Sequence, residues 1–314
     1  MSEDHQTFDR DLLRRRRSRF AHEMPQHEFL LSHVAAEIAD RIGAVLREFP
    51  RALDLGAYHG MLGRAVAALP PVGEMIYAES VAVLAALCPR PSVVCDEDLL
   101  PFRDGSFNLV VSGVALHRVN DVPGALVQIR RALRPDGLFM GAALGSRSLH
   151  ELRYALIEAE ADEEGGASPR IAPFADVREY GALLQRAGFA LPVSDADLLT
   201  VTYPTPRDLM REIRAMGGGN VLAARRKGPL PRRTLERAEA IYRTRHATPD
   251  GRVVASFEIV YLMGWAPHAS QQKPAEPGSA TMRLADALGT TEHAAGDEAA
   301  FPAKIGSAKR SSQD

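Results

Sequence analysis

Cysteine is scarce in this sequence. Cys88 and Cys95 are the only two cysteines among 314 residues, and they lack the spacing of a CxxC motif. Two thiols cannot build the disulfide framework of a small secreted protein. Each is expected to be a small, buried, apolar side chain. Cysteine usage therefore indicates a reducing, cytoplasmic compartment.

Long apolar runs and a large net charge are also missing. The longest apolar runs, 109–116 and 137–145, have the length of strands and fall well short of the roughly 20 residues of a membrane span. The formal charge is only −2, so no overall field favours nucleic acid, and none is expected as a partner. The sequence predicts no transmembrane segment and leaves open a peripheral position at the inner face of a membrane.

Lysine is rare, because the sequence has four lysines against 34 arginines. Such a skew is typical of a coding bias, so we discount clusters of arginine as functional signals. Residues 1–25 are polar and arginine-rich, and no apolar stretch follows the arginines at 14–17 to predict a secretory signal. We expect this segment to be a loosely held arm.

What is present is the balance of an ordinary globular protein, with 46% hydrophobic and 25% charged residues. A helical spacing of apolar residues at 27–49 ends at Pro50. Beyond it, short apolar stretches alternate with helical ones, which predicts βαβ units and a mostly parallel sheet covered on both faces. Strands are expected at 51–55, 74–78, 92–95, 107–112 and 138–143, and helices at 60–69, 81–87 and 123–133.

The second half of the chain has a different order. Helices are expected at 148–160, 177–187, 206–216 and 233–244, and strands at 188–193, 198–203 and 253–264. We divide the chain into an arm at 1–25, a domain at 26–266 and a tail at 267–314. The tail is rich in small and polar residues that bury too little apolar surface to fold, so we expect it to be largely disordered.

A glycine-containing turn follows the first strand. The strand ends at Asp54, and Gly56, Ala57 and Gly60 lead into the next helix. Glycine at such a turn lets backbone N–H groups and the N-terminus of the helix approach a ligand closely. The pattern is weak evidence when it stands alone.

Acidic residues at the ends of the next two strands strengthen that evidence. Glu79 ends the second strand, 25 residues after Asp54, and Asp96 and Glu97 end the third. A carboxylate at the first position can accept both ribose hydroxyls of a nucleoside, and one at the second can meet an adenine amino group. Open α/β sheets bind their ligands at this edge.

Together these residues resemble the class I methyltransferases that depend on S-adenosylmethionine (SAM), over about residues 49–143. The segments that carry the resemblance are 53–56, 79, 96, 100–102, 107–112 and 133–138. The resemblance implies a Rossmann-like α/β fold, with a seven-stranded, mostly parallel sheet and an antiparallel last strand. The region at 204–252 is then a helical cap inserted before that strand.

The resemblance also implies SAM as the cofactor and assigns the residues that bind it. The methionine part falls to Asp54, Gly56, Ala57 and Gly60, the ribose to Glu79, and the adenine to Asp96 and Glu97; Ser112, at the end of the fourth strand, joins this set. One departure is Tyr58, which stands where the family has a central glycine. Either the turn adapts with the ring pointing outward, or SAM binding is weakened.

One branch of the family is similar over most of residues 7–282. The segments that recur in it are 8–12, 116–121, 165–170, 186–189, 215–217, 261–265 and 271–280. This branch is the methyltransferase-like assembly factor of respiratory complex I and its bacterial relatives. It implies modification of an arginine on a complex I subunit, by hydroxylation in the mitochondrial member. The carrier-protein methyltransferase of biotin synthesis is similar in the core domain.

Methyl transfer from SAM requires no fixed catalytic base, because the cofactor supplies the reactivity and the protein supplies orientation. His117, after the fourth strand, is the candidate catalytic residue, which orients a substrate or accepts a proton; the alternative is a structural histidine. Iron oxygenases use two histidines and a carboxylate, and no such pattern stands out, so no metal site is predicted. Hydroxylation therefore depends on the resemblance alone.

The cap carries a basic stretch at 225–233, preceded by Arg207, Arg211 and Arg214. We expect it to dock a protein substrate, and the alternative is an ordinary solvated face. Three functions stay open. The chain is an enzyme that modifies an arginine of a respiratory-complex subunit, a SAM methyltransferase for a small molecule or carrier protein, or a non-catalytic assembly chaperone, which Tyr58 favours.

Overall fold

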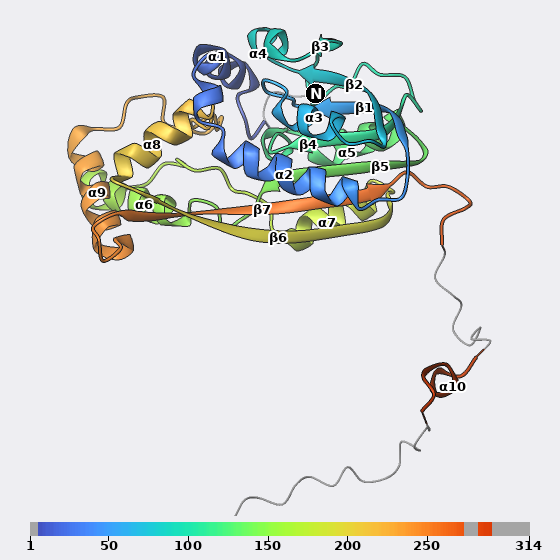
Figure 1. Cartoon of the computed structure of the whole chain (residues 1–314). Helices are drawn as coiled ribbons and strands as arrows, with labels where there is room; N and C mark the ends of the chain where they lie inside the picture. Colours follow the sequence, from blue (N-terminus) through green and yellow to red (C-terminus); the bar gives the residue numbers. More distant parts are fainter. Residues whose placement is uncertain (1–5, 273–281, 291–314) are drawn as a thin grey trace, which may run out of the picture. The chain divides into compact units, whose positions relative to one another are not determined.

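Seven strands of the described residues form one sheet, in the order β3-β2-β1-β4-β5-β7-β6 (Figure 1). The computed structural model describes residues 6–272 and 282–290. The strands are β1 (Phe49–Leu55), β2 (Val72–Glu79), β3 (Ser92–Val94), β4 (Phe107–Gly113), β5 (Leu133–Leu144), β6 (Ala190–Tyr203) and β7 (Val253–Trp265). Neighbours from β3 to β5 are parallel, and β7 is antiparallel to both β5 and β6. The predicted sheet with an antiparallel last strand is confirmed.

Helices cover both faces of this sheet, as the alternating pattern predicts. On one face lie α2 (Phe29–Gly43), α3 (Met61–Ala67) and α4 (Ala82–Leu87), and on the other α5 (Val122–Ala132) and α7 (Val177–Arg186). The apolar side of α2 repeats every four residues, and Val34, Ile38 and Ile42 are buried against the sheet. Cys88 and Cys95 are buried as expected, and burial raises the pKa of both thiols to about 12.

The long strands β6 and β7 extend beyond the rest of the sheet and carry a helical cap at their far end (Figure 1). This cap, the predicted insertion 204–252, contains α8 (Pro206–Ala215) and α9 (Arg232–His246), and α6 (His150–Glu164) packs against α9. The two strands predicted at 188–193 and 198–203 are one strand, which corrects the prediction. The polar residues between them are tolerated because β6 is an edge strand with a solvent-facing side.

The expectation of a loosely held N-terminal arm is wrong for the residues after Thr7. Arg10–Phe20 form helix α1, in which Asp9 accepts a hydrogen bond at the N-terminus from the amide of Leu12. Leu13 is buried, and Phe8 pairs with Leu222 of the cap in a short β-bridge. Contacts with residues far along the chain hold this segment in place, and amino-acid composition does not predict such contacts.

The C-terminal part of the chain is a separate unit, 270–314, in which Leu284–Leu288 form helix α10. Most of the tail predicted to be disordered lies outside the described residues, and the proposed domain boundaries stay predictions. Within the described ranges, none of the helices is long and apolar enough to cross a membrane.

Candidate functional site

The glycine turn lies at the carboxyl end of β1, as predicted. Gly56 has a φ of 71°, and a Cβ there would collide with the Cβ of Ala115. Gly60, with a φ of 85°, begins α3. Both positions therefore require glycine for conformation and for space, since a Cβ at Gly60 would lie 2.9 Å from Cδ of Pro89. Asp54 is fully buried and accepts a hydrogen bond from the amide of Gly63 at 2.9 Å.

Backbone groups of this turn are already used within the protein. The amides of Gly56 and Ala57 donate to the carbonyl of Ala78 at 2.9 and 3.0 Å. Side-chain oxygens, in contrast, are left over: Oδ1 of Asp54 and Oγ of Ser112 are buried and have no hydrogen-bond partner in the described part of the chain. These two oxygens, rather than the turn amides, are the groups available to a ligand.

Tyr58 adapts to the turn in a way that the sequence did not predict. Its backbone has a φ of 54°, a region that a non-glycine residue rarely enters. Its amide donates to Oε2 of Glu79 at 2.8 Å, and its hydroxyl donates to the carbonyl of Val114 at 3.0 Å. The residue as a whole is 8% exposed. Of the two alternatives, an outward-pointing ring is therefore wrong, because both ends of the residue have buried partners, and weakened SAM binding stays a prediction.

The predicted acids converge at the adjacent strand ends. Glu79 is fully buried at the end of β2 and accepts hydrogen bonds from the amides of Tyr58 and Val81. Ser80 lies between Glu79 and Glu97, with Oγ 3.3 and 3.4 Å from the two carboxylates. Burial raises the pKa of Glu79, and the charge of Glu97 adds to this effect. We call Glu79, Asp96, Glu97 and Asp98 the acid row.

Arginines of α1 cover the acid row, and the sequence analysis missed them. Arg17 contacts Glu79, and Arg10 contacts Asp96 and Glu97. Their spacing on one helix was visible in the sequence. Because the chain has 34 arginines, we attributed each arginine cluster to composition and discounted this spacing as a functional signal.

His117 lies in the short helix Leu116–Arg118 after β4 and is 6% exposed. Its Nε2 accepts a hydrogen bond from Nε of Arg118 at 3.2 Å, so the neutral ring carries its proton on Nδ1. Burial, together with the charges of Arg118 and Arg17, holds its pKa well below the usual value. Nδ1 has no partner among the residues described. His117 is thus arranged to donate a hydrogen bond rather than to accept a proton.

His59, next to Tyr58, has the opposite arrangement. Its Nε2 lies 2.9 Å from Oε2 of Glu28 and donates to that carboxylate, which leaves Nδ1 as an acceptor. Nδ1 is buried without a partner in the described ranges. Burial lowers the pKa of this ring despite the nearby carboxylate. His59 is therefore a neutral acceptor backed by Glu28.

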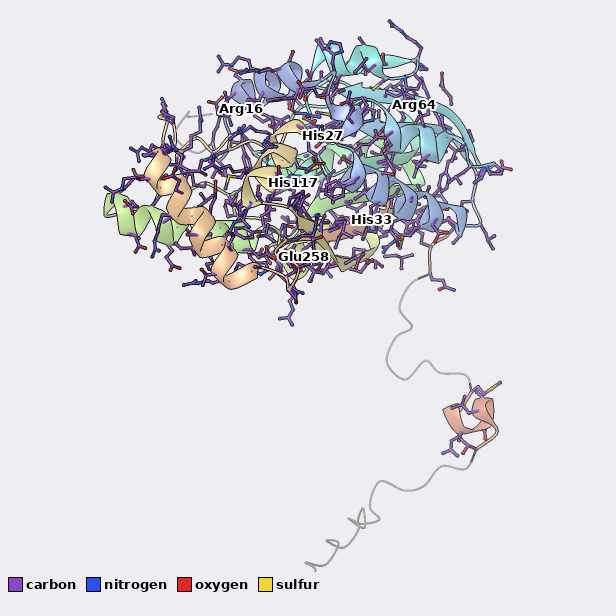
Figure 2. All side chains as sticks on the ribbon, turned by 60° about the vertical axis from the view of Figure 1, so that its left-hand side comes forward. Arg16, His27, His33, Arg64, His117 and Glu258 are labelled. Carbon is purple, nitrogen blue, oxygen red and sulfur yellow. The ribbon has the colours of Figure 1, made fainter. Side chains whose placement is uncertain are left out.

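A single cavity brings these histidines together. His27, His59 and His117 line it, with His27 and His117 labelled in Figure 2. Its other walls are mainly apolar and come from α2, α8, the end of β5 and the segments 171–174 and 216–222. We call it the central cavity. Glu28 is the single carboxylate among the described residues that line it, and Arg118 is half-buried there.

A second hollow, which we call the basic groove, adjoins the central cavity and shares residues 170–171 and 218–220 with it. The groove is lined by cations from α1, the cap and the segment between α6 and α7: Arg16, Arg19, Arg170, Arg214, Arg225, Arg226 and Lys227 (Arg16 is labelled in Figure 2). None of its described lining residues is acidic. Burial and the charges of Arg225 and Arg214 lower the pKa of Arg16.

Several arginines of the basic stretch in the cap already form ion pairs with acidic residues of the same chain. Arg225 pairs with Asp9 at 3.1 Å, and Arg226 pairs with Glu164. Arg233 and Arg237 pair with acids of α6. These arginines are therefore not free cations, and docking of a protein substrate by the basic stretch stays a prediction. Within the described residues, no set of three His, Cys, Asp or Glu side chains is arranged to hold a metal ion.

The comparison with protein families matches a methyltransferase domain over residues 53–141. Among individual proteins, the chain is 42% identical over 287 residues to the human "Arginine-hydroxylase NDUFAF5, mitochondrial", covering 89% of this chain and 82% of that protein. It is 34% identical to a malonyl-[acyl-carrier protein] O-methyltransferase of Halorhodospira halophila, covering 88% of this chain and 94% of that protein.

Solved structures are similar in fold. The YcgJ protein of Bacillus subtilis aligns with a TM-score of 0.53 at 16% identity and covers 76% of this chain and 99% of that one. A methyltransferase structure from Bacillus halodurans aligns with a TM-score of 0.52 at 14% identity. At such identities the likeness concerns the fold alone. The acid row and the glycine turn described above occupy the strand ends of this shared sheet.

Proposed function

This chain belongs to the class I SAM-dependent methyltransferase superfamily, in the branch that includes arginine-hydroxylase NDUFAF5 and the malonyl-[acyl-carrier protein] O-methyltransferases, and on this basis we propose that it is an enzyme that uses SAM to modify a protein side chain. The observation that carries the proposal is the acid row beside the glycine turn, in which Glu79 and Glu97 are buried. Acids at these two strand ends meet the needs of a nucleoside.

The residues fit SAM in chemical type and in position. Glu79 would accept the ribose hydroxyls, and Asp96 and Glu97 would meet the adenine. The methionine part would lie by Gly56, Ala57 and Gly60, where Gly56 leaves no room for a Cβ. Oδ1 of Asp54 and Oγ of Ser112, which are buried without a hydrogen-bond partner among the described residues, would provide further polar contacts. The same residues were assigned from the sequence.

When bound, SAM supplies a methyl group made reactive by its sulfonium centre. The chain's own residues then position the substrate and handle its proton. We propose that His117 donates from Nδ1 to orient the substrate, and that the acceptor Nδ1 of His59 receives a proton, with Glu28 stabilising the charge. The apolar walls of the central cavity exclude water from this pair.

We propose an arginine of a respiratory complex I subunit as the target, at the cytoplasmic side of the membrane. Support comes from the arginine-hydroxylase activity in the name of the human relative and from the branch resemblance over residues 7–282. A carrier protein is the second candidate. The basic groove favours it, because a groove lined by cations suits an acidic partner, and a relative acting on an acyl-carrier protein aligns over most of its length.

Mass spectrometry of complex I subunits tests this target. In a strain without this chain, we expect one subunit arginine to lose a modification that returns when the chain is restored. A lost mass of one methylene indicates methylation, which is the reaction that the methyl group of SAM supplies. A lost mass of one oxygen indicates hydroxylation, which requires an oxidant and which transfer of the SAM methyl group cannot provide. Modified arginine that persists in the deletion strain contradicts the proposal. Loss of a methyl ester on carrier-protein substrates would instead favour the second candidate.

Charge reversal in the basic groove tests docking of the substrate protein. Arg214 and Lys227 are exposed and have no ion pair with a described residue, so Arg214→Glu with Lys227→Glu leaves internal contacts intact. We expect modification to become about tenfold slower, because electrostatic attraction raises association rates. Exposed Arg178 and Arg186 on α7 provide the matched control. Equal rates for both double variants would place docking elsewhere.

A further inference from the structure

One face of α1 presents three arginines to the acid row. Arg10, Arg14 and Arg17 follow one another at intervals of four and three residues, which places them on the same side of the helix. The arginines between them differ, since Arg15 is exposed and Arg16 faces the basic groove. The contact with the acid row is therefore a property of one helical face and not of basic composition.

Arg17 occupies the position assigned to the ribose. Its side chain is almost fully buried, and Nη2 lies 3.0 Å from Oε2 of Glu79. Its guanidinium stacks on the ring of Tyr58, with Cζ 4.1 Å from the ring centroid. Nη1 lies 3.9 Å from Oε1 of Glu97. A ribose approaching Glu79 would meet this guanidinium on the same carboxylate oxygen.

Arg10 and Arg14 occupy the position assigned to the adenine. Arg10 forms ion pairs with Glu97, with Asp96 at 2.6 Å and with Asp98 at 3.4 Å. Arg14 pairs with the second oxygen of Asp96. The oxygens that would accept hydrogen bonds from an adenine amino group are thus already held by guanidinium groups.

Charge balance explains why these contacts form. A buried carboxylate without a partner is strongly unfavourable, and a guanidinium removes much of that penalty. Ribose and adenine are neutral and cannot compensate the charge in the same way. In addition, a guanidinium and a hydroxyl cannot both hold the same oxygen lone pairs of a carboxylate.

We propose that α1 and SAM compete for the acid row, so that SAM binds only as the face of Arg10, Arg14 and Arg17 withdraws. The three arginines then set the affinity of the chain for its cofactor. This inference rests on the proposed function, since it takes SAM as the ligand of the acid row. The alternative to competition is that α1 stays in place and supports the bound cofactor.

Calorimetric titration with SAM separates these two possibilities. Arg17→Gln removes the charge that competes at Glu79, and we expect SAM to bind about tenfold more tightly or better, as for loss of one charged hydrogen bond. Arg17→Lys keeps the charge and should stay closer to the wild type. Arg15→Gln, on the exposed face of α1, is the matched control and should match the wild type.

Hydrogen exchange on the unaltered full chain provides a second measurement that does not depend on how the variants fold. Saturating SAM should accelerate exchange of the amides of α1. Unchanged or weaker SAM binding by Arg17→Gln, with slower exchange in α1, would overturn the competition and make α1 a support for the cofactor. If neither the wild type nor any variant binds SAM, the proposed function itself fails, and the competition with it.

Discussion

Replacing Glu79 with alanine is expected to weaken SAM binding by about a hundredfold or more. The fully buried carboxylate would accept both ribose hydroxyls, and each charge-assisted hydrogen bond contributes roughly 1.5–3 kcal/mol. The same change leaves the guanidinium of Arg17 buried beside an empty space. We therefore expect the free energy of unfolding to fall as well, by about 3–5 kcal/mol.

Calorimetry and urea denaturation measure the two effects separately. Glu74→Ala is the matched control, because Glu74 lies on the same strand, half-exposed, and pairs only at the surface with Arg51. Glu79→Gln keeps the size and one acceptor oxygen, so its SAM affinity should fall between those of the alanine variant and the wild type. Equal SAM affinity in Glu79→Ala and Glu74→Ala would remove Glu79 from the cofactor site.

The contribution of Asp54 to the stability of the protein is expected to fall as pH rises from about 4 to 7. Burial raises the pKa of this carboxyl to about 7, the charge of Glu79 adds to the rise, and the amide of Gly63 opposes it. In the unfolded chain the same group releases its proton near pH 3.8. Between these values the unfolded state has lost the proton and the folded state has kept it, so rising pH favours unfolding.

Asp54→Asn removes this titration while its side-chain oxygen can still accept from Gly63. The difference in unfolding free energy between wild type and variant should therefore decrease with a slope approaching about 1.4 kcal/mol per pH unit, or roughly 4 kcal/mol across the interval. Above about pH 7 the difference should be constant. Denaturation curves at several pH values give the slope, with exposed Asp40→Asn as the control. A flat difference would mean that Asp54 is ionised in the folded protein.

The two histidines of the central cavity are each oriented by a charged residue. The Glu28 carboxylate backs His59 from the start of α2, while Arg118 occupies one nitrogen of His117. The proton-accepting role considered for His117 therefore passes, in our proposal, to His59. Both rings are buried and neutral, and each has one nitrogen without a partner among the described residues. That nitrogen is a donor in His117 and an acceptor in His59, because the other nitrogen accepts from Arg118 in His117 and donates to Glu28 in His59.

The sequence alone determined the sheet and the acid row, for a physical reason. Apolar spacing reports whether a short segment is a strand or a helix, and parallel strands bring their carboxyl ends to one edge. The position of Glu79 and Glu97 along the chain was therefore enough to place them together. The same local reasoning placed Gly56, whose φ of 71° only glycine adopts freely.

Tertiary structure alone decided what faces these acids. Arg17 and Glu79 are 62 positions apart, and no periodicity links a helix before the first strand to the end of the second. The arginine excess that argued against any one cluster could not show which side chains of α1 are buried. Long-range packing removes these charges from water, and a charge that is buried in this way needs a partner of opposite charge. The sequence therefore specified where the acids gather, and the packing of α1 determined which charges pair with them.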